Sequence, residues 1–382
     1  MFLDETAEEA GLRAELRRYL GELITDEVRA EGGEGGGPKF REVLRRLGRD
    51  GWLGLGWPRE LGGRGGSPIE ELIFYDEIQR LDFPIPFLTL CAVGPTILAL
   101  GTDEQRATLI PRILAGELIC AIGYSEPEAG TDLASLKTRA VRDGEVYVVD
   151  GQKVFTSGAE YADYIWLAVR TDPSAPRHRG ISLLLVDTKL PGVSVAPIHT
   201  LAGTRTNATF YDGVRVPVSM RVGRENEGWK IITTQLNHER VALSAPGACT
   251  RAVEEATRFA RETGRIDEPW VQLTLARAHA RLEAVRLMAW RQAWRLGQGQ
   301  PDPAESSAIK VFSSESFVEI YRLLLEVLGP DGALRSGSPG ALLRGRLEMF
   351  YRATLVFTFG GGTNEVQRDI IAGIGLGMPR GR

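Results

Sequence analysis

Three consecutive glycines near the C-terminus, Gly360–Gly362, separate an apolar run from a helical pattern in the stretch FTFGGGTNEVQRDII, residues 357–371. Glycine has no Cβ, so its backbone can come very close to another group. We expect this turn to present backbone N–H donors, because the glycines offer no side chain that could move a proton. Any acid or base that works beside the turn must therefore come from another part of the chain.

A second polar stretch is AIGYSEPEAGTDLASLKTRA, residues 121–140. It places a Ser-Glu-Pro triplet directly before Ala-Gly-Thr-Asp. The glycine and the hydroxyl residues could donate hydrogen bonds to a polar ring or to a phosphate. The alternative is a capped turn between a helix and a strand, and the stretch taken alone favours that simpler interpretation.

The residue types give little support for a metal site, a zinc or disulfide pair, or a serine hydrolase. The four histidines show no metal-ligand spacing, the three cysteines form no C-x-x-C pair, and no G-x-S-x-G motif is present. The net charge of −4 does not predict nucleic-acid binding, and no apolar run is long enough to span a membrane. The cysteine pattern and the acidic, amphipathic N-terminal stretch predict a cytoplasmic protein.

The hydrophobic period divides the chain into three blocks. Residues 1–118 read as an N-terminal helical domain, in which Ser67 precedes Pro68 as a helix cap and a break at Gly101-Thr102 separates two short helices. Residues 119–223 read as a central β domain, with turns predicted at Asp143-Gly144 and Asp150-Gly151. Residues 224–382 return to long helical patterns. The predicted fold class is α+β and mainly helical.

Four stretches together resemble the acyl-CoA dehydrogenase family in their order and spacing. They are the two stretches above together with DGQKVFTSGAEYAD, residues 150–163, and LNHERVALSAPG, residues 236–247. The resemblance extends over the whole chain and includes GWLGLGWPRELGGRGGSPIE, residues 51–70. Within the family the chain looks most like an actinobacterial subgroup that acts on bulky acyl-CoAs such as those of sterol side chains.

The resemblance implies an FAD-dependent oxidation of an acyl-CoA thioester to the trans-2-enoyl-CoA. A carboxylate removes the α proton, the β hydrogen leaves as a hydride to flavin N5, and donors to the thioester oxygen stabilise the developing enolate. Many members carry the base just before the Gly-Thr of the C-terminal motif, where this chain has Gly361. The Gly361 N–H would then donate to the thioester oxygen, with Gly360 beside the substrate.

The resemblance places the base on a helix instead. A minority of the family carries it in a Leu-x-x-Glu-Arg pattern, which Leu236–Arg240 matches with Glu239 as the base. Arg240 matches an arginine on the CoA side. By the same resemblance, residues of the β domain and of the C-terminal motif contact the flavin. These cofactor residues are Tyr124, Ser125, Gly130, Thr131, Phe155, Thr156, Ser157, Thr363 and Glu365.

Two positions depart from the family pattern of homotetramers, in which a neighbouring subunit holds the ADP half of each flavin. Thr263 replaces the usual arginine, and Pro330 replaces a glycine in a later loop. A hetero-oligomer with a homologous chain, α2β2, is therefore favoured over a homotetramer in which Arg261 or Arg265 makes these contacts. The expected electron acceptor is an electron-transfer flavoprotein. An accessory subunit of a heteromeric dehydrogenase and a flavin monooxygenase of the same fold remain alternatives.

Overall fold

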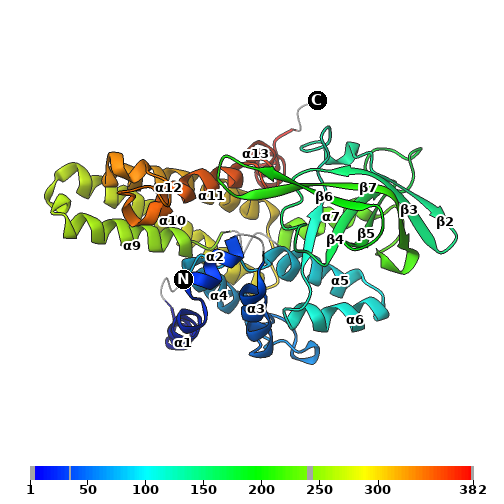
Figure 1. Ribbon diagram of the computed structural model, residues 1–382, viewed down its shortest axis with the longest axis horizontal. Helices are drawn as coiled ribbons and strands as arrows, with labels where there is room; N and C mark the ends of the chain where they lie inside the picture. The colour runs from blue at the N-terminus through cyan, green and yellow to red at the C-terminus, as the bar shows by residue number, and fades with distance from the viewer. Residues whose placement is uncertain (1–4, 34–35, 239–243, 380–382) are drawn as a thin grey trace.

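The computed structural model describes residues 5–33, 36–238 and 244–379. Figure 1 shows a β domain at one end of the molecule, a C-terminal helical bundle at the other, and the N-terminal helices below both. This arrangement confirms the predicted α+β, mainly helical fold.

The N-terminal helices are α1 (Ala7–Leu23), α2 (Asp26–Gly33), α3 (Pro38–Arg49), α4 (Pro68–Arg80), α5 (Gly94–Leu100) and α6 (Asp103–Leu114). The Ser67 hydroxyl accepts a hydrogen bond from the Glu70 N–H and Pro68 opens α4. Thr102 caps α6 in the same way after the break at Gly101. Both caps were predicted from the sequence, because Ser and Thr satisfy the free N–H groups at a helix start.

Eight strands form one sheet in the order β6-β7-β3-β2-β4-β5-β8, and β1 pairs in parallel with β4. The strands are β1 (Cys120–Gly123), β2 (Arg139–Asp143), β3 (Val146–Lys153), β4 (Tyr164–Arg170), β5 (Ile181–Asp187), β6 (Val193–His199), β7 (Arg205–Pro217) and β8 (Arg221–Val222). Asp143-Gly144 makes the predicted hairpin turn between β2 and β3. The turn predicted at Asp150-Gly151 is wrong, because both residues lie within β3, where the pairing with β7 slips beside Gly151.

The central strands β4 and β5 are buried on both faces, so their side chains alternate between two cores. Trp166, Leu183 and Leu185 pack with the N-terminal helices. Ile165, Leu167, Val169, Leu184 and Val186 belong to the core of the β domain. Successive residues of a strand point to opposite faces, which explains why these strands read as unbroken apolar runs.

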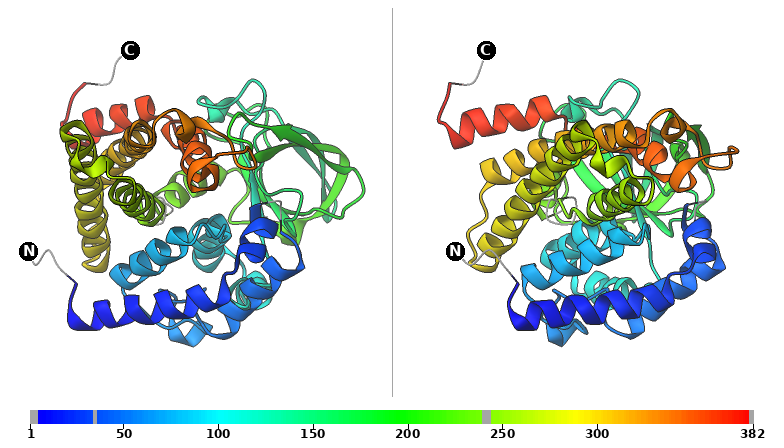
Figure 2. Two further views of the ribbon diagram at one scale, coloured as in Figure 1. Left: turned by 60° about the vertical axis from the view of Figure 1, so that its left-hand side comes forward. Right: turned by 90° about the vertical axis from the view of Figure 1, so that its left-hand side faces the viewer.

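The C-terminal helices are α7 (Gly228–His238), α9 (Gly247–Glu262), α10 (Pro269–Gly297), α11 (Pro303–Leu328), α12 (Arg346–Thr354) and α13 (Asn364–Ile370). Figure 2 shows the N-terminal helices lying beneath this bundle. Arg346 of α12 joins the two parts through hydrogen bonds of 2.6 and 2.7 Å to Asp82. In the part of the chain that the structure describes, no helix is both long and apolar enough to cross a membrane.

Glu71 of α4 makes the stability of the fold depend on pH. Burial raises the pKa of Glu71 to about 7. Since the ordinary pKa is lower, the folded state holds this proton more tightly than the unfolded chain, so the free energy of unfolding falls as pH rises from about 4.5 to about 7.

We predict that Glu71→Gln leaves the stability near pH 4.5 almost unchanged and raises it by about 1–3 kcal/mol at pH 8, because it removes a poorly solvated charge. Urea unfolding at both pH values measures the difference. Glu42→Gln on the exposed face of α3 is the control and should be neutral at both. An equal effect of Glu71→Gln at the two pH values would contradict the prediction.

Candidate active site

Two of the predicted cofactor segments lie side by side at the edge of the β domain. The Val154 N–H, just after β3, donates to the Ser125 carbonyl, just after β1, at 2.9 Å. The Thr156 N–H then donates to the Asn207 carbonyl of β7 at 2.9 Å. The structure therefore brings Tyr124 and Ser125 together with Phe155, Thr156 and Ser157, and fixes both segments to the sheet. Gly130 and Thr131 lie nearby in sequence on an exposed loop.

Phe155 has two unusual properties for a large aromatic residue. Its φ of 60° lies in the left-handed region, and 65% of its surface is exposed. A bulky residue with positive φ is strained by about 1–3 kcal/mol, and such strain is concentrated at functional sites. The ring thus presents a flat apolar face to the outside, while the neighbouring Thr156 and Ser157 hydroxyls face Thr209 and Thr206 at 3.3 and 2.9 Å.

A buried ion pair lies beneath the Ser125 segment. The Lys153 side chain is 0% exposed, and its Nζ donates to Glu126 Oε1 at 2.8 Å and to the Tyr124 carbonyl at 3.0 Å. Burial lowers the pKa of Lys153 to about 8, although Glu126 opposes this. Burial alone would raise the pKa of Glu126, but Lys153 and the hydrogen bonds from Thr138 and Lys137 outweigh it and lower that pKa. The 2.8 Å contact makes the two groups an ion pair.

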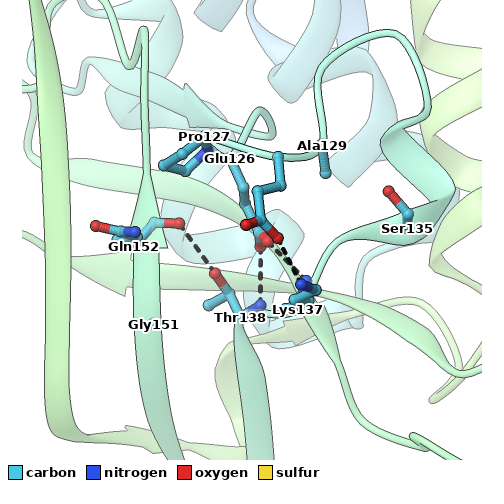
Figure 3. A pocket seen from close by; sticks show the side chains of 9 residues that line it. Glu126, Pro127, Ala129, Ser135, Lys137, Thr138, Gly151 and Gln152 are labelled. Carbon is cyan, nitrogen blue, oxygen red and sulfur yellow. Dashed lines mark hydrogen bonds and ion pairs between the residues drawn. The ribbon is translucent and has the colours of Figure 1, made fainter.

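A pocket of about 300 Å³ lies at this loop and is lined in part by Glu126, Lys137 and Thr138 (Figure 3). Glu126 accepts from the Thr138 and Lys137 N–H groups at 2.8 and 2.6 Å, and the Thr138 hydroxyl donates to the Gln152 carbonyl at 3.2 Å. None of the predicted catalytic or cofactor residues lines this pocket. The pocket belongs to the outer side of the loop, and its hydrogen bonds hold the loop in shape.

The Tyr124 side chain connects the β domain to α7. The Trp166 Nε1–H donates to the Tyr124 hydroxyl at 2.9 Å, and that hydroxyl donates to Gln235 Oε1 at 2.7 Å. Gln235 is 1% exposed, and its Nε2 has no hydrogen-bond partner among the residues that the structure describes. A buried donor without an acceptor costs about 1–3 kcal/mol. Gln235 therefore offers a donor beside the loop that carries the predicted cofactor residues.

The glycine turn has one N–H in use and two available. The Gly360 N–H donates to the Val356 carbonyl at 2.7 Å. Gly361 and Gly362 have φ of 67° and 95°, and their N–H groups donate to no acceptor among the described residues. All three glycines are exposed. The geometry agrees with a turn that presents the Gly361 N–H to a ligand.

The other residues of this motif begin α13. The Thr363 hydroxyl accepts from the Val366 N–H at 3.3 Å and caps the helix. Glu365 lies exposed in its first turn. The predicted base Glu239 and its neighbour Arg240 lie outside the described residues, directly after the last described residue of α7, His238. Their roles remain predictions.

Three protein-family models match successive parts of the chain. They are the N-terminal domain of acyl-CoA dehydrogenase over residues 6–117, the middle domain over residues 121–212 and the C-terminal domain over residues 226–375. The chain belongs to the acyl-CoA dehydrogenase family. Members of this family catalyse acyl-CoA dehydrogenation and in general depend on FAD.

Similar proteins match over the full length of the chain. Acyl-CoA dehydrogenase FadE26 of Mycobacterium tuberculosis is 53% identical over 397 residues, which covers 100% of this chain and 99% of that protein. The Tcur3481-Tcur3483 steroid ACAD has a TM-score of 0.96 and 51% identity, with 100% of both chains covered. The ChsE4-ChsE5 complex from Mycobacterium tuberculosis has a TM-score of 0.94 and 53% identity, again with 100% of both chains covered.

The described residues of this acyl-CoA dehydrogenase fit a flavin ring. Phe155 offers an exposed flat surface, Ser157 is exposed two residues later, and the buried Thr156 holds the segment to β7. A Cβ built at Gly130 meets nothing within 4 Å, so the loop leaves room for a ligand. An exposed aromatic face with a hydroxyl in the same segment suits a planar heterocycle with polar edges.

Three side chains that organise the site were missed by sequence reasoning, namely Lys153, Gln235 and Lys310. The one available signal is for Lys310, which falls on the buried stripe of α11 with Ile309, Ser313, Ser314 and Phe317. A lysine in register with buried residues indicates a hydrogen-bonded role, because an unpaired buried charge is very costly.

We predict that removing both partners of the Lys153–Glu126 pair costs clearly less stability than the sum of removing each one alone. Lys153→Met and Glu126→Gln should each destabilise the protein by about 3–5 kcal/mol, since each leaves a buried charge unpaired. The double variant should lose clearly less than the sum of the two. Urea unfolding measures all four corners of this double-mutant cycle.

The exposed pair Lys137–Glu128 is a matched control in the same loop, with side chains 75% and 76% exposed. Its removal by Lys137→Met should cost less than about 1 kcal/mol. Additive effects of Lys153→Met and Glu126→Gln would mean that the buried pair does not act as a unit.

Proposed function

We propose that this chain catalyses the FAD-dependent α,β-dehydrogenation of an acyl-CoA thioester to the trans-2-enoyl-CoA. Family membership supports the reaction class. The observation that carries the assignment of roles is the glycine turn, in which the Gly361 N–H is available and no side chain can act as base. We assign the base to Glu239, which follows α7 in the Leu-x-x-Glu-Arg pattern.

Each residue then has a definite task in the reaction. Glu239 removes the proton from the α carbon, and the Gly361 N–H donates to the thioester oxygen, where negative charge develops. Arg240 and Gly360 contact the substrate. FAD, when bound, supplies the acceptor for the β hydride. Holding these groups in one fixed arrangement lowers the barrier, because the charge develops in a place already lined with donors.

We assign the cofactor contacts to the two adjoining segments of the β domain and to the start of α13. The residues are Tyr124, Ser125, Gly130, Thr131, Phe155, Thr156, Ser157, Thr363 and Glu365. Tyr124 contributes through its backbone, since its hydroxyl is taken by Gln235 and Trp166. An electron-transfer flavoprotein is the proposed acceptor of the electrons. The three cysteines form no disulfide in the part of the chain that the structure describes, which agrees with the proposed cytoplasmic location, because reducing compartments disfavour disulfides.

The proposed substrates are acyl-CoAs with bulky, sterol-derived acyl groups. One similar structure is a steroid ACAD with 51% identity over the whole chain. Gly361 offers a physical reason, because the glutamate side chain that many family members carry at this position is absent here.

We also propose a hetero-oligomer, α2β2, with a homologous chain that supplies the missing ADP contacts. Arg265, which is one of the two alternatives for this contact together with Arg261, donates instead to the Val327 carbonyl at 3.0 Å. Glu326, where the family often has Gln, pairs with Arg322. Apolar side chains next to the glycine turn in the chain are exposed, including Val356 at 45% and Phe359 at 59%, and a partner chain would cover them. Two similar structures are each named for a pair of proteins, Tcur3481-Tcur3483 and ChsE4-ChsE5, which supports a heteromeric assembly here as well.

We predict that acyl-CoAs with sterol-derived acyl groups bleach the visible flavin band under anaerobic conditions, and that short linear acyl-CoAs do so far more slowly. Glu239→Gln should lower the bleaching rate by about 10³-fold or more, because the α proton then has no base. Glu262→Gln, an exposed change at the end of α9, is the control and should be neutral.

The same experiment tests the alternatives. An unchanged rate in Glu239→Gln would place the chemistry on another chain and make this protein an accessory subunit. Substrate-dependent oxygen consumption with product hydroxylation would indicate a monooxygenase. No bleaching by any acyl-CoA in a flavin-loaded protein would contradict the dehydrogenase assignment.

We further predict that the chain purified alone holds much less than one FAD per polypeptide, and that co-expression with its homologous partner restores the flavin. Absorbance gives the FAD content and light scattering gives the mass of the assembly. Arg265→Ala should leave the FAD content of the complex unchanged. One FAD per polypeptide in the isolated chain, lost in Arg265→Ala, would support a homotetramer instead.

A further inference from the structure

Lys310 is a buried lysine whose ammonium group reaches the glycine turn. It lies on α11 and is 8% exposed. Its Nζ donates to the Gly362 carbonyl at 2.6 Å and to Asn364 Oδ1 at 2.8 Å. The turn and the lysine are 52 residues apart in the chain. The long helix of the bundle is thus joined directly to the segment that carries the proposed thioester contact.

The contacts around Asn364 make this connection rigid. Asn364 is 3% exposed, and its Nδ2 donates to Ser314 Oγ at 3.1 Å and to Glu315 Oε1 at 3.2 Å. Both acceptors lie on α11, one turn after Lys310. Lys310, Ser314 and Glu315 therefore hold the start of α13 from the same face of the helix.

The orientation of the Gly361 N–H depends on both ends of the turn. The upstream end is fixed by the Gly360 N–H, which donates to the Val356 carbonyl at 2.7 Å. The downstream end is fixed by Lys310 at the Gly362 carbonyl. Between them the backbone has positive φ at both Gly361 and Gly362, a conformation that glycine leaves freely when nothing restrains it. Without the lysine, the peptide groups of the turn could rotate.

We propose that Lys310 is a positioning residue for the reaction: it restrains the glycine turn so that the Gly361 N–H points at the thioester oxygen, and its positive charge favours negative charge at the turn. The inference rests on the proposed function and adds a residue that does not touch the substrate. Displacing a donor by about 1 Å can cost about 10²-fold in rate. We therefore expect that replacing Lys310 weakens enolate stabilisation more than an equally destabilising substitution elsewhere in the helix does.

The test uses the flavin-loaded complex and a probe that separates proton abstraction from hydride transfer. An acyl-CoA with sulfur in place of the β methylene has no β hydrogen, so it can lose its α proton but cannot be oxidised. The resulting enolate beside the oxidised flavin gives a long-wavelength absorption band. Its pH titration reports how strongly the site stabilises the enolate.

Lys310→Met should raise the pKa of the bound probe by about one or more, a tenfold weaker stabilisation, and lower kcat by about 10- to 100-fold with a smaller change in KM. Lys310→Arg should recover part of both. Ile320→Ala is the control for lost stability, because Ile320 lies in the core of the bundle on the same helix and does not contact the turn. It should leave the pKa of the probe unchanged. Asn364→Ala removes one of the lysine's acceptors and should shift the pKa in the same direction by less.

The proposal is overturned if Lys310→Met titrates the probe as the wild type does, or if Ile320→Ala shifts it equally. If Lys310→Met does not fold, Asn364→Ala and Lys310→Arg decide the question, and wild-type titration in both overturns it. A wild-type complex that neither deprotonates the probe nor oxidises any acyl-CoA would instead overturn the proposed function.

Discussion

The loops that build this site depend on one physical constraint: each has a backbone carbonyl that faces the protein interior and needs a hydrogen-bond donor there. A buried lysine meets this need in two places. Lys153, 0% exposed, donates to the Tyr124 carbonyl at the end of β1, and Lys310, 8% exposed, donates to the Gly362 carbonyl. An ammonium group loses much solvation on burial, so it is retained only where it is hydrogen-bonded. In the glycine turn, the Gly361 and Gly362 N–H groups donate to no acceptor among the described residues, while Lys310 holds the Gly362 carbonyl.

Local signals explain how far the sequence predicts the fold. The caps at Ser67 and Thr102 and the hairpin at Asp143-Gly144 depend on neighbouring residues, and each lies where the pattern predicts it. Asp150-Gly151 carries the same turn signal and lies inside β3. There, β3 is paired with β2 on one side and β7 on the other, so the long ladder outweighs a local preference. The glycine instead accommodates the slip in register with φ of 148°.

The site was less predictable, because its supports join distant parts of the chain. Lys153 and Glu126 are 27 residues apart, and Tyr124 and Gln235 are 111 residues apart. Periodicity places Lys153 on a strand and Gln235 on a helix, but no local pattern says which elements meet. The positions expected to contact a ligand were named only through the resemblance of four motifs, and their roles remain predictions. The structure adds the buried side chains that hold these positions in place.

Moving the base away from the glycine turn changes what the rest of the protein must do. In relatives with a glutamate at this position, one short segment carries both the base and the donor to the thioester oxygen. Here, by the proposed assignment, the donor stays on the turn before α13 and the base follows α7. Their alignment then depends on two separate sets of contacts. Lys310 restrains the turn against α11, while the Tyr124 hydroxyl restrains α7 through Gln235.

This separation also gives a reason for both the glycines and the buried polar contacts. By the proposed assignment, glycine at 361 leaves the place of the family's glutamate side chain to the acyl group, but a turn of three glycines has little rigidity of its own, since glycine is the least restrained residue. Rigidity must then come from the surrounding side chains, and short charged hydrogen bonds supply it more strongly than neutral ones. Tyr124 provides a comparable restraint on α7, the helix that precedes the proposed base, through its hydrogen bond to Gln235.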